Sequence, residues 1–249
     1  MRINNYFADG YFKSTGTRLA YEVLCARGFL LEYVDSKIMI SDNSHIKDAR
    51  YLDEILRTYD IGRVCGDIVL IQDIDNTQRL LQLFEGGQQI RQEMCCYYYD
   101  WRYFSRRVHG FKVPTIDLEP YIARYIKAIS SAGVLTYSCC DGNHGEKESY
   151  VRIGFSGYPS MMWHRFLWKE YYSKSFALDW DCNYTCIRVT EDNRKDIYRE
   201  LNRVAADIYA DREALRKVKQ KSTRWINRRV IREYNEEEIG SKVIQVAKQ

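Results

Sequence analysis

Hydrophobic positions follow two different periods along this chain. Apolar side chains at helical spacing predict helices over residues 18–27, 46–59, 77–84, 88–104, 116–131 and 160–172. Short apolar or alternating runs predict strands over residues 29–34, 37–41, 67–74, 134–137, 150–155 and 184–190. Because strands and helices do not alternate regularly, we predict an α+β fold in which short antiparallel strands pack with several helices.

The carboxy-terminal part, from residue 193 to about residue 234, predicts a long helix. Its apolar side chains recur at heptad-like intervals, with one interruption at Asp211: Ile197, Leu201, Val204, Ile208, Leu215 and Val218. Such a seam is typical of a coiled-coil or dimer helix. A non-enzymatic interaction module, with a homo-oligomer formed through this helix, is therefore one hypothesis for the function.

Breaking residues give one candidate domain boundary, between Gly110 and Pro114. It predicts an amino-terminal α+β region over residues 1–112 and a carboxy-terminal α+β region over residues 113–249. The second region holds the residues with the richest chemistry and the long basic helix. One continuous domain is the alternative, since no low-complexity linker separates the two.

Composition narrows the class of protein. The chain is 45% hydrophobic and 29% charged, as in globular proteins. No apolar run approaches the ~20 residues of a membrane helix, and the first ten residues lack the apolar segment of a signal peptide. Eight cysteines in a chain of 249 residues favour free thiols over a disulfide framework. We therefore expect a cytoplasmic protein with no membrane partner.

Reactive side chains gather between two predicted strands, within residues 133–145 (GVLTYSCCDGNHG). If the chain is an enzyme, we predict Cys140 as the nucleophile, His144 as its base and Asp141 as the group that orients the base. A second interpretation is ligand binding, in which loop N–H groups hold a phosphate or carboxylate. Ser138 and Asn143 would then complete the pocket.

Two further interpretations of these residues stay open. Asp141 and Gly142 form a typical hairpin turn, so the segment is also compatible with a purely structural role. A zinc site is disfavoured because neighbouring Cys139 and Cys140 point to opposite faces of extended backbone and no standard ligand spacing is present. We predict no metal ligands, and the sequence identifies no cofactor.

A short stretch around residues 136–142 resembles the S-S-C-S-G segment of the wybutosine-synthesis methyltransferase family. This chain has an extra residue before Gly142 and lacks the arginine that follows in that family. The stretch also resembles a Gly-x-x-Thr-x-x-Ser-Cys-x-Gly-His pattern of uncharacterised phage and bacterial proteins, which Gly133, Thr136 and His144 match only approximately. Neither resemblance implies a function.

Three other segments carry candidate chemistry. Residues 97–109 interleave aromatic side chains with Arg102, Arg106, Arg107 and His109, a pattern typical of single-strand nucleic-acid binding or of a buried stripe with a basic face. Asp73 and Asp75 lie at the end of the strand predicted over residues 67–74, where capping of the next helix by Asp75 and Asn76 is favoured over a magnesium site. The tail is rich in bases: Arg212, Arg216, Lys217, Lys219, Lys221, Arg224, Arg228, Arg229 and Arg232.

These patterns predict a protein that handles nucleic acid or a nucleotide-like phosphate ligand. The site would lie at residues 138–144, and the basic segments would guide the polyanion. The net charge of +4 permits such a partner without requiring it. The sequence leaves open whether the protein is an enzyme, and which ligand it binds.

Overall fold

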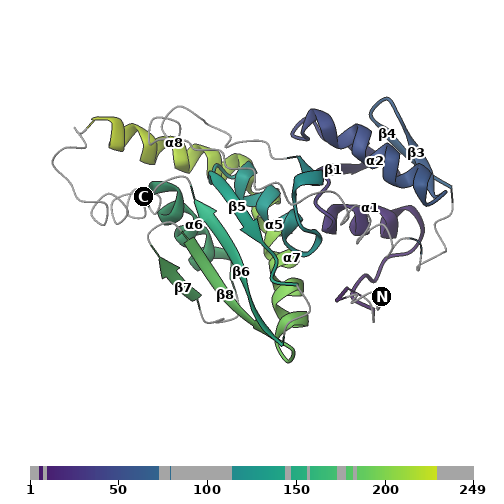
Figure 1. Cartoon of the computed structure of the whole chain (residues 1–249). Coiled ribbons are helices and arrows are strands. Elements are labelled where there is room, and N and C mark those ends of the chain that lie inside the picture. The colour runs from purple at the N-terminus through teal and green to yellow at the C-terminus, as the bar shows by residue number, and fades with distance from the viewer. Residues whose placement is uncertain are drawn as a thin grey trace. The chain divides into compact units, whose positions relative to one another are not determined.

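The computed structural model confirms the α+β class. It describes residues 6–7, 10–72, 79, 114–143, 147–155, 158–172, 178–181 and 184–228. Within these residues lie six α-helices, one 3₁₀ helix and two four-stranded antiparallel sheets (Figure 1). Contacts divide the chain into two compact units: unit 1 comprises residues 1–93, 112–127 and 192–202, and unit 2 comprises residues 94–111, 128–191 and 203–249. The predicted boundary at residues 112–113 lies outside the described residues and stays a prediction.

Unit 1 is built from two hairpins and two helices. Its sheet has the order β1-β2-β4-β3, with β1 at Leu31–Val34, β2 at Lys37–Ile40, β3 at Gly62–Cys65 and β4 at Ile68–Ile71. Helix α1 (Gly16–Ala26) precedes the first hairpin, and α2 (Ile46–Thr58) connects the two hairpins. The β1–β2 turn places Asp35 and Ser36 at positive φ, as two-residue hairpin turns require.

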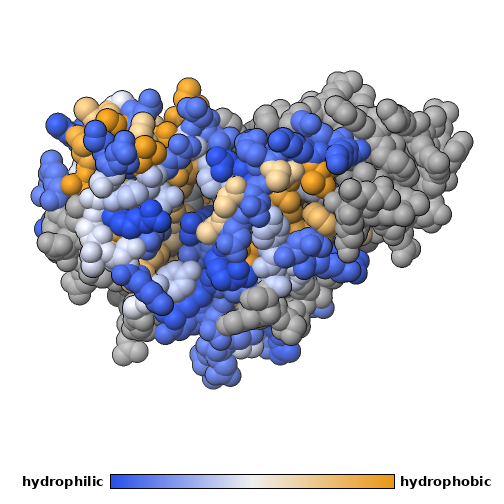
Figure 2. Space-filling view, turned by 180° about the vertical axis from the view of Figure 1, so that it is seen from behind, coloured by the Kyte–Doolittle hydropathy of each residue, from blue (hydrophilic) through white to orange (hydrophobic). Residues whose placement is uncertain are grey.

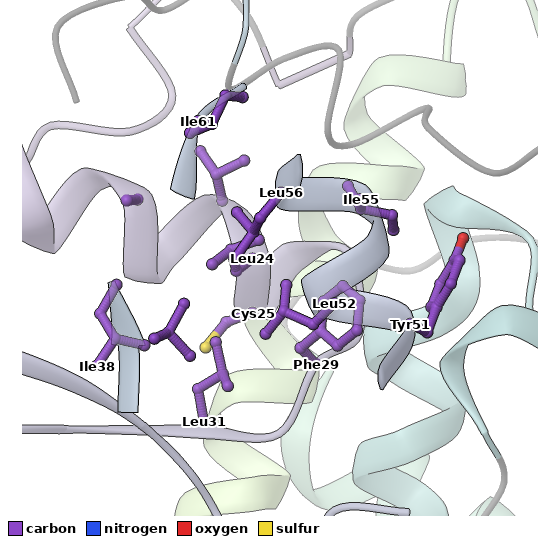
Figure 3. Close-up of a cluster of buried hydrophobic side chains, with 13 residues drawn as sticks. Leu24, Cys25, Phe29, Leu31, Ile38, Tyr51, Leu52, Ile55, Leu56 and Ile61 are labelled. Atoms are coloured by element: carbon purple, nitrogen blue, oxygen red, sulfur yellow. The ribbon is translucent and has the colours of Figure 1, made fainter. Parts of the chain in front are cut away.

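One buried cluster holds these elements of unit 1 together (Figure 3). Apolar side chains at helical spacing on α1 and α2 meet the inward-facing positions of the strands. Leu24, Leu56 and Ile38 are completely buried, and the remaining members are Ala20, Val23, Cys25, Phe29, Leu31, Tyr51, Leu52, Ile55, Ile61 and Val69. The apolar pattern of residues 18–56 therefore corresponds to side chains that are buried in one core.

Unit 1 also contains a buried ion pair. The carboxylate of Asp48, in the first turn of α2, lies 2.6 Å from Nζ of Lys127. Lys127 belongs to α5 (Pro120–Ser131). The same carboxylate accepts a hydrogen bond of 2.7 Å from the backbone N–H of Thr115, which begins the 3₁₀ helix η1 (Thr115–Asp117). Both charged side chains are only 3% exposed, so each buried charge is compensated by the opposite charge of its partner and not by water.

Unit 2 is organised around the second sheet, of order β5-β6-β8-β7. The strands are β5 (Thr136–Cys140), β6 (Glu148–Phe155), β7 (Leu178–Asp181) and β8 (Tyr184–Thr190). Alternate residues of β6 and β8 are buried, among them Val151, Ile153 and Ile187. Helix α6 (Tyr158–Tyr171) packs on this buried face, where the ring of its His164 lies 4.8 Å from that of Phe155. The opposite face of the sheet carries the half-buried and exposed residues.

Side chains of unit 2 donate hydrogen bonds to the backbone carbonyl groups at the carboxy-terminal end of α5. Trp163 Nε1 donates to the carbonyl of Ala132 at 2.9 Å, and Arg216 Nε donates to the carbonyl of Ser131 at 3.0 Å. Gly133 follows at φ +97°, and the side chain of Lys219 lies against its Cα. Cations near the last carbonyls of a helix are favourable. Arg216 and Lys219 are buried. The prediction that the basic tail guides a polyanion stays a prediction.

The predicted tail helix is two helices, α7 (Arg194–Ala210) and α8 (Arg212–Arg228), separated at Asp211. Four seam residues of α7 are completely buried: Ile197, Leu201, Val204 and Ile208. Leu215 on α8 is 6% exposed. The heptad pattern therefore reflects packing inside the chain, while oligomerisation remains untested.

Two short strands, β3 and β7, were not predicted. Apart from Arg79, the predicted helices at residues 77–84 and 88–104 lie outside the described residues. Among the described residues, none of the helices has the length and apolar content needed to cross a bilayer. The described cysteines, Cys25, Cys65, Cys139, Cys140 and Cys186, are free thiols.

Candidate functional site

The predicted reactive loop begins later than the sequence suggests. Ser138, Cys139 and Cys140 belong to β5, which runs to Cys140 and pairs with β6. Cys139 pairs with Ile153 of the buried face, whereas Cys140 pairs with Arg152 of the other face. The two thiols consequently point to opposite sides of the sheet, as extended backbone requires.

A tight turn follows β5. Asp141 is buried, and its Oδ1 accepts a hydrogen bond of 2.8 Å from the backbone N–H of Asn143. The N–H of Gly142 points to Sγ of Cys140 at 3.4 Å, and the Ser149 hydroxyl donates to the carbonyl of Gly142. Both backbone N–H groups are therefore engaged within the turn. A phosphate at this point would have to displace these hydrogen bonds, so the turn itself gives little support to an anion site.

Gly142 is expected to be irreplaceable in this turn. Its φ of +71° lies in the left-handed region, and a Cβ there would meet the carbonyl oxygen of Tyr150 at 2.8 Å. Because the obstacle is backbone, we expect Gly142→Ala to lower the free energy of unfolding by roughly 2 kcal/mol. Urea unfolding followed by far-ultraviolet circular dichroism, which reports on both units, measures this, with Gly66→Ala as control. Gly66 shares the positive φ but has open space around it, and equal losses for both variants would contradict a steric cause.

The catalytic hypothesis cannot be tested at His144, which lies outside the described residues. Six other candidate residues also lie outside the described residues: Arg102, Arg106, Arg107, His109, Asp73 and Asp75. The structure therefore brings together Ser138, Cys140, Asp141 and Asn143 on one strand and its turn. Within the part of the chain that the structure describes, no three His, Cys, Asp or Glu side chains lie close enough to hold a metal ion.

The exposed side of the second sheet carries side chains that the loop hypothesis did not include. We call this side the open face, and define it by alternation and pairing as Ser138 and Cys140 of β5, Glu148, Tyr150, Arg152 and Gly154 of β6, and Tyr184, Cys186 and Arg188 of β8. Tyr150 is 45% exposed. Ser138 and Cys140, two of the predicted site residues, thus belong to a larger surface that spans three strands.

Gly154 is the point where three side chains of the open face converge. A Cβ on Gly154 would lie 2.5 Å from Ser138 Oγ, 2.9 Å from Tyr137 Cζ and 3.0 Å from Tyr184 Cε1. The register of β5 against β6 shifts between Thr136 and Ser138, and this bulge turns the Tyr137 ring toward the same side. The missing side chain of Gly154 therefore allows two tyrosine rings to lie close to the sheet.

An arginine completes this aromatic group. The Tyr137 and Tyr184 ring centroids are 5.7 Å apart in an edge-to-face arrangement. The guanidinium of Arg152 stacks on the Tyr184 ring, with Cζ 3.9 Å from its centroid. Arg152 is exposed, so this side chain is accessible to a ligand. Planar cationic and aromatic surfaces of this kind bind nucleobases by stacking.

Charges on the open face nearly cancel. Glu148 and Arg188 form an exposed ion pair, with Arg188 Nε 2.7 Å from Oε1. The hydrogen bond from Arg188 lowers the pKa of the Glu148 carboxyl, so this acid stays ionised near neutral pH. Asp179 of β7 pairs with Cys186 at the edge of the face and is exposed. Among the described residues of the open face, Arg152 is therefore the main cation that a ligand would meet.

Tyr137, Tyr150, Arg152 and Tyr184 were missed as site residues. A signal was present, because alternation in YVRIGF and YTCIRVT assigns Tyr150, Arg152 and Tyr184 to the polar side of two strands. Alternation alone does not predict that β6 pairs with β8, and this pairing brings Arg152 and Tyr184 into contact. No protein family, curated protein or solved structure matches the chain.

Proposed function

We propose that the protein binds nucleic acid or a nucleotide-like ligand on the open face of its second sheet. The observation that supports this most is the Arg152 guanidinium stacked 3.9 Å above the Tyr184 ring on an accessible sheet surface. Together with Tyr137, these groups offer planar partners for a base and a positive charge for a phosphate. Ser138 and Cys140 lie beside them on β5 and would contact the bound ligand.

Binding is proposed without a committed chemical reaction. Cys140 belongs to the open face, and its Sγ accepts a hydrogen bond from the N–H of Gly142. The roles predicted for Cys140, His144 and Asp141 in catalysis stay a prediction. Hydrophilic residues cover much of the described surface in the view of Figure 2, with hydrophobic residues gathered in places. That surface is compatible with a polar ligand, and the reaction remains a separate question.

The proposal predicts that Arg152→Ala weakens binding of a labelled single-stranded 12-mer or of a labelled ATP analogue by roughly tenfold. The substitution removes both the stacked guanidinium and its charge, and stacking contributes about 1–3 kcal/mol per base. Fluorescence anisotropy at fixed salt gives the affinity. Arg165→Ala is the matched control, because Arg165 is an exposed arginine of α6, on the other side of the sheet.

Both variants should have the melting temperature of the wild type. Equal binding by wild type and Arg152→Ala would exclude the open face as the binding surface. Absence of binding to every oligonucleotide and nucleotide probe would exclude the proposed function as a whole.

A further inference from the structure

We infer that the ligand of the open face is single-stranded nucleic acid, RNA or DNA, held by stacking of at least two unpaired bases. This inference rests on the proposed function and narrows it. It excludes three kinds of ligand: a mononucleotide, a duplex and a bare sugar–phosphate chain. The reasons are the spacing of the planar side chains along β6 and the small net charge of the face.

Planar side chains form two stations along β6. The first consists of Tyr137, Tyr184 and Arg152 around Gly154. The second is Tyr150, which is 45% exposed. Gly154 and Tyr150 are both on β6, four positions apart, so their backbone positions are separated by roughly 13 Å at 3.3 Å per residue, and Arg152 lies between them in the strand. One base cannot reach both, whereas a chain of two or three nucleotides spans such a distance, as on four-stranded RNA-binding sheets.

The charge of the face favours bases over phosphates. Arg188 is already paired with Glu148 at 2.7 Å, and Asp179 adds a negative charge at the edge. Arg152 therefore supplies the main attraction for a phosphate. A ligand that binds chiefly through its backbone needs several cations in a row, because each neutralised phosphate contributes to affinity. A duplex hides the flat faces of its bases and would find few partners here.

The experiment compares five labelled probes at constant salt by fluorescence anisotropy. They are a mixed-sequence single-stranded heptamer, as RNA and as DNA, an abasic heptamer of the same length, a duplex of the heptamer sequence, and a single nucleotide. We expect the base-bearing heptamers to bind at least tenfold more tightly than the other three. The log–log salt dependence should have a slope of only about −0.7 to −1.4, corresponding to one or two phosphates.

Tyr150 provides the matched variants. Tyr150→Leu should weaken heptamer binding roughly tenfold, because the heptamer stacks on both stations and this variant removes one of them. Tyr150→Phe keeps the ring and should bind like the wild type. If Tyr150→Leu binds the heptamer as tightly as the wild type does and has the same thermal melt, Tyr150 is not a second stacking site and the inference is overturned.

The two proposals fail in different ways. If no probe binds, the proposed function is wrong and the inference falls with it. If the abasic heptamer, the duplex or the single nucleotide binds as tightly as the base-bearing heptamers, the proposed function stands and the inference is overturned. A salt slope steeper than about −3 would likewise assign the affinity to phosphates.

Discussion

Replacing Asp48 by asparagine is expected to lower the free energy of unfolding of unit 1 by roughly 3–5 kcal/mol, because the change leaves the ammonium of Lys127 buried without its counter-charge. The pair is 2.6 Å long, and both side chains are 3% exposed. Asparagine keeps an acceptor for the N–H of Thr115. Its amide nitrogen replaces the oxygen that accepts from Lys127 Nζ and from the Thr115 hydroxyl, so the loss includes both the charge and these hydrogen bonds. Hydrogen exchange at the amides of α2, together with urea unfolding followed by far-ultraviolet circular dichroism, measures the change.

The same helix offers a control. Arg57 and Asp53 form an i,i+4 pair on the surface of α2, with Arg57 61% exposed. Arg57→Gln should therefore cost less than about 1 kcal/mol. The double variant Asp48→Asn/Lys127→Met should recover part of the loss, since it removes both charges. A loss below 1 kcal/mol for Asp48→Asn alone would show that the buried pair does not hold η1 and α5 against α2.

The sequence predicted helices better than strands, for a physical reason. Helices α1, α2, α5 and α6 have long apolar stripes whose period is set by the backbone alone. Strands β3 and β7 have four residues each, too few for alternation to be recognised. The heptad seam was found correctly, but the sequence could not predict that its residues pack inside the chain, because the same stripe is compatible with a dimer and with an intramolecular core. The predicted homo-oligomer stays a prediction.

The site was only partly accessible to the sequence. Cys140 and Ser138 could be noticed because they lie within one dense stretch of reactive residues. Arg152 and Tyr184 are separated by 32 positions and meet only through the register that pairs Ile153 with Thr185. Register depends on tertiary packing and on bulges such as the one at Tyr137. Contacts across strands therefore escape a search for local motifs.

Stability of unit 2 is expected to rise with pH through the titration of Lys219. This lysine is 1% exposed, and burial lowers its pKa to about 7. In the unfolded chain the pKa returns to about 10.4. Between these values the unfolded chain binds more protons than the folded one, so the free energy of unfolding increases as pH rises. From pH 7 to pH 10 the gain is roughly 3 kcal/mol.

Comparison of two methionine variants isolates this effect from other groups that titrate in alkali. All five tryptophans belong to unit 2, so urea unfolding followed by tryptophan fluorescence reports on that unit. The stability difference between wild type and Lys219→Met should grow by roughly 3 kcal/mol in favour of wild type from pH 7 to pH 10. Lys217→Met is the control, because Lys217 is an exposed lysine of the same helix and should follow the wild type at every pH. A pH-independent difference between wild type and Lys219→Met would mean that Lys219 keeps its ordinary pKa, and that the cation is well solvated or fully compensated by the carbonyls at the end of α5.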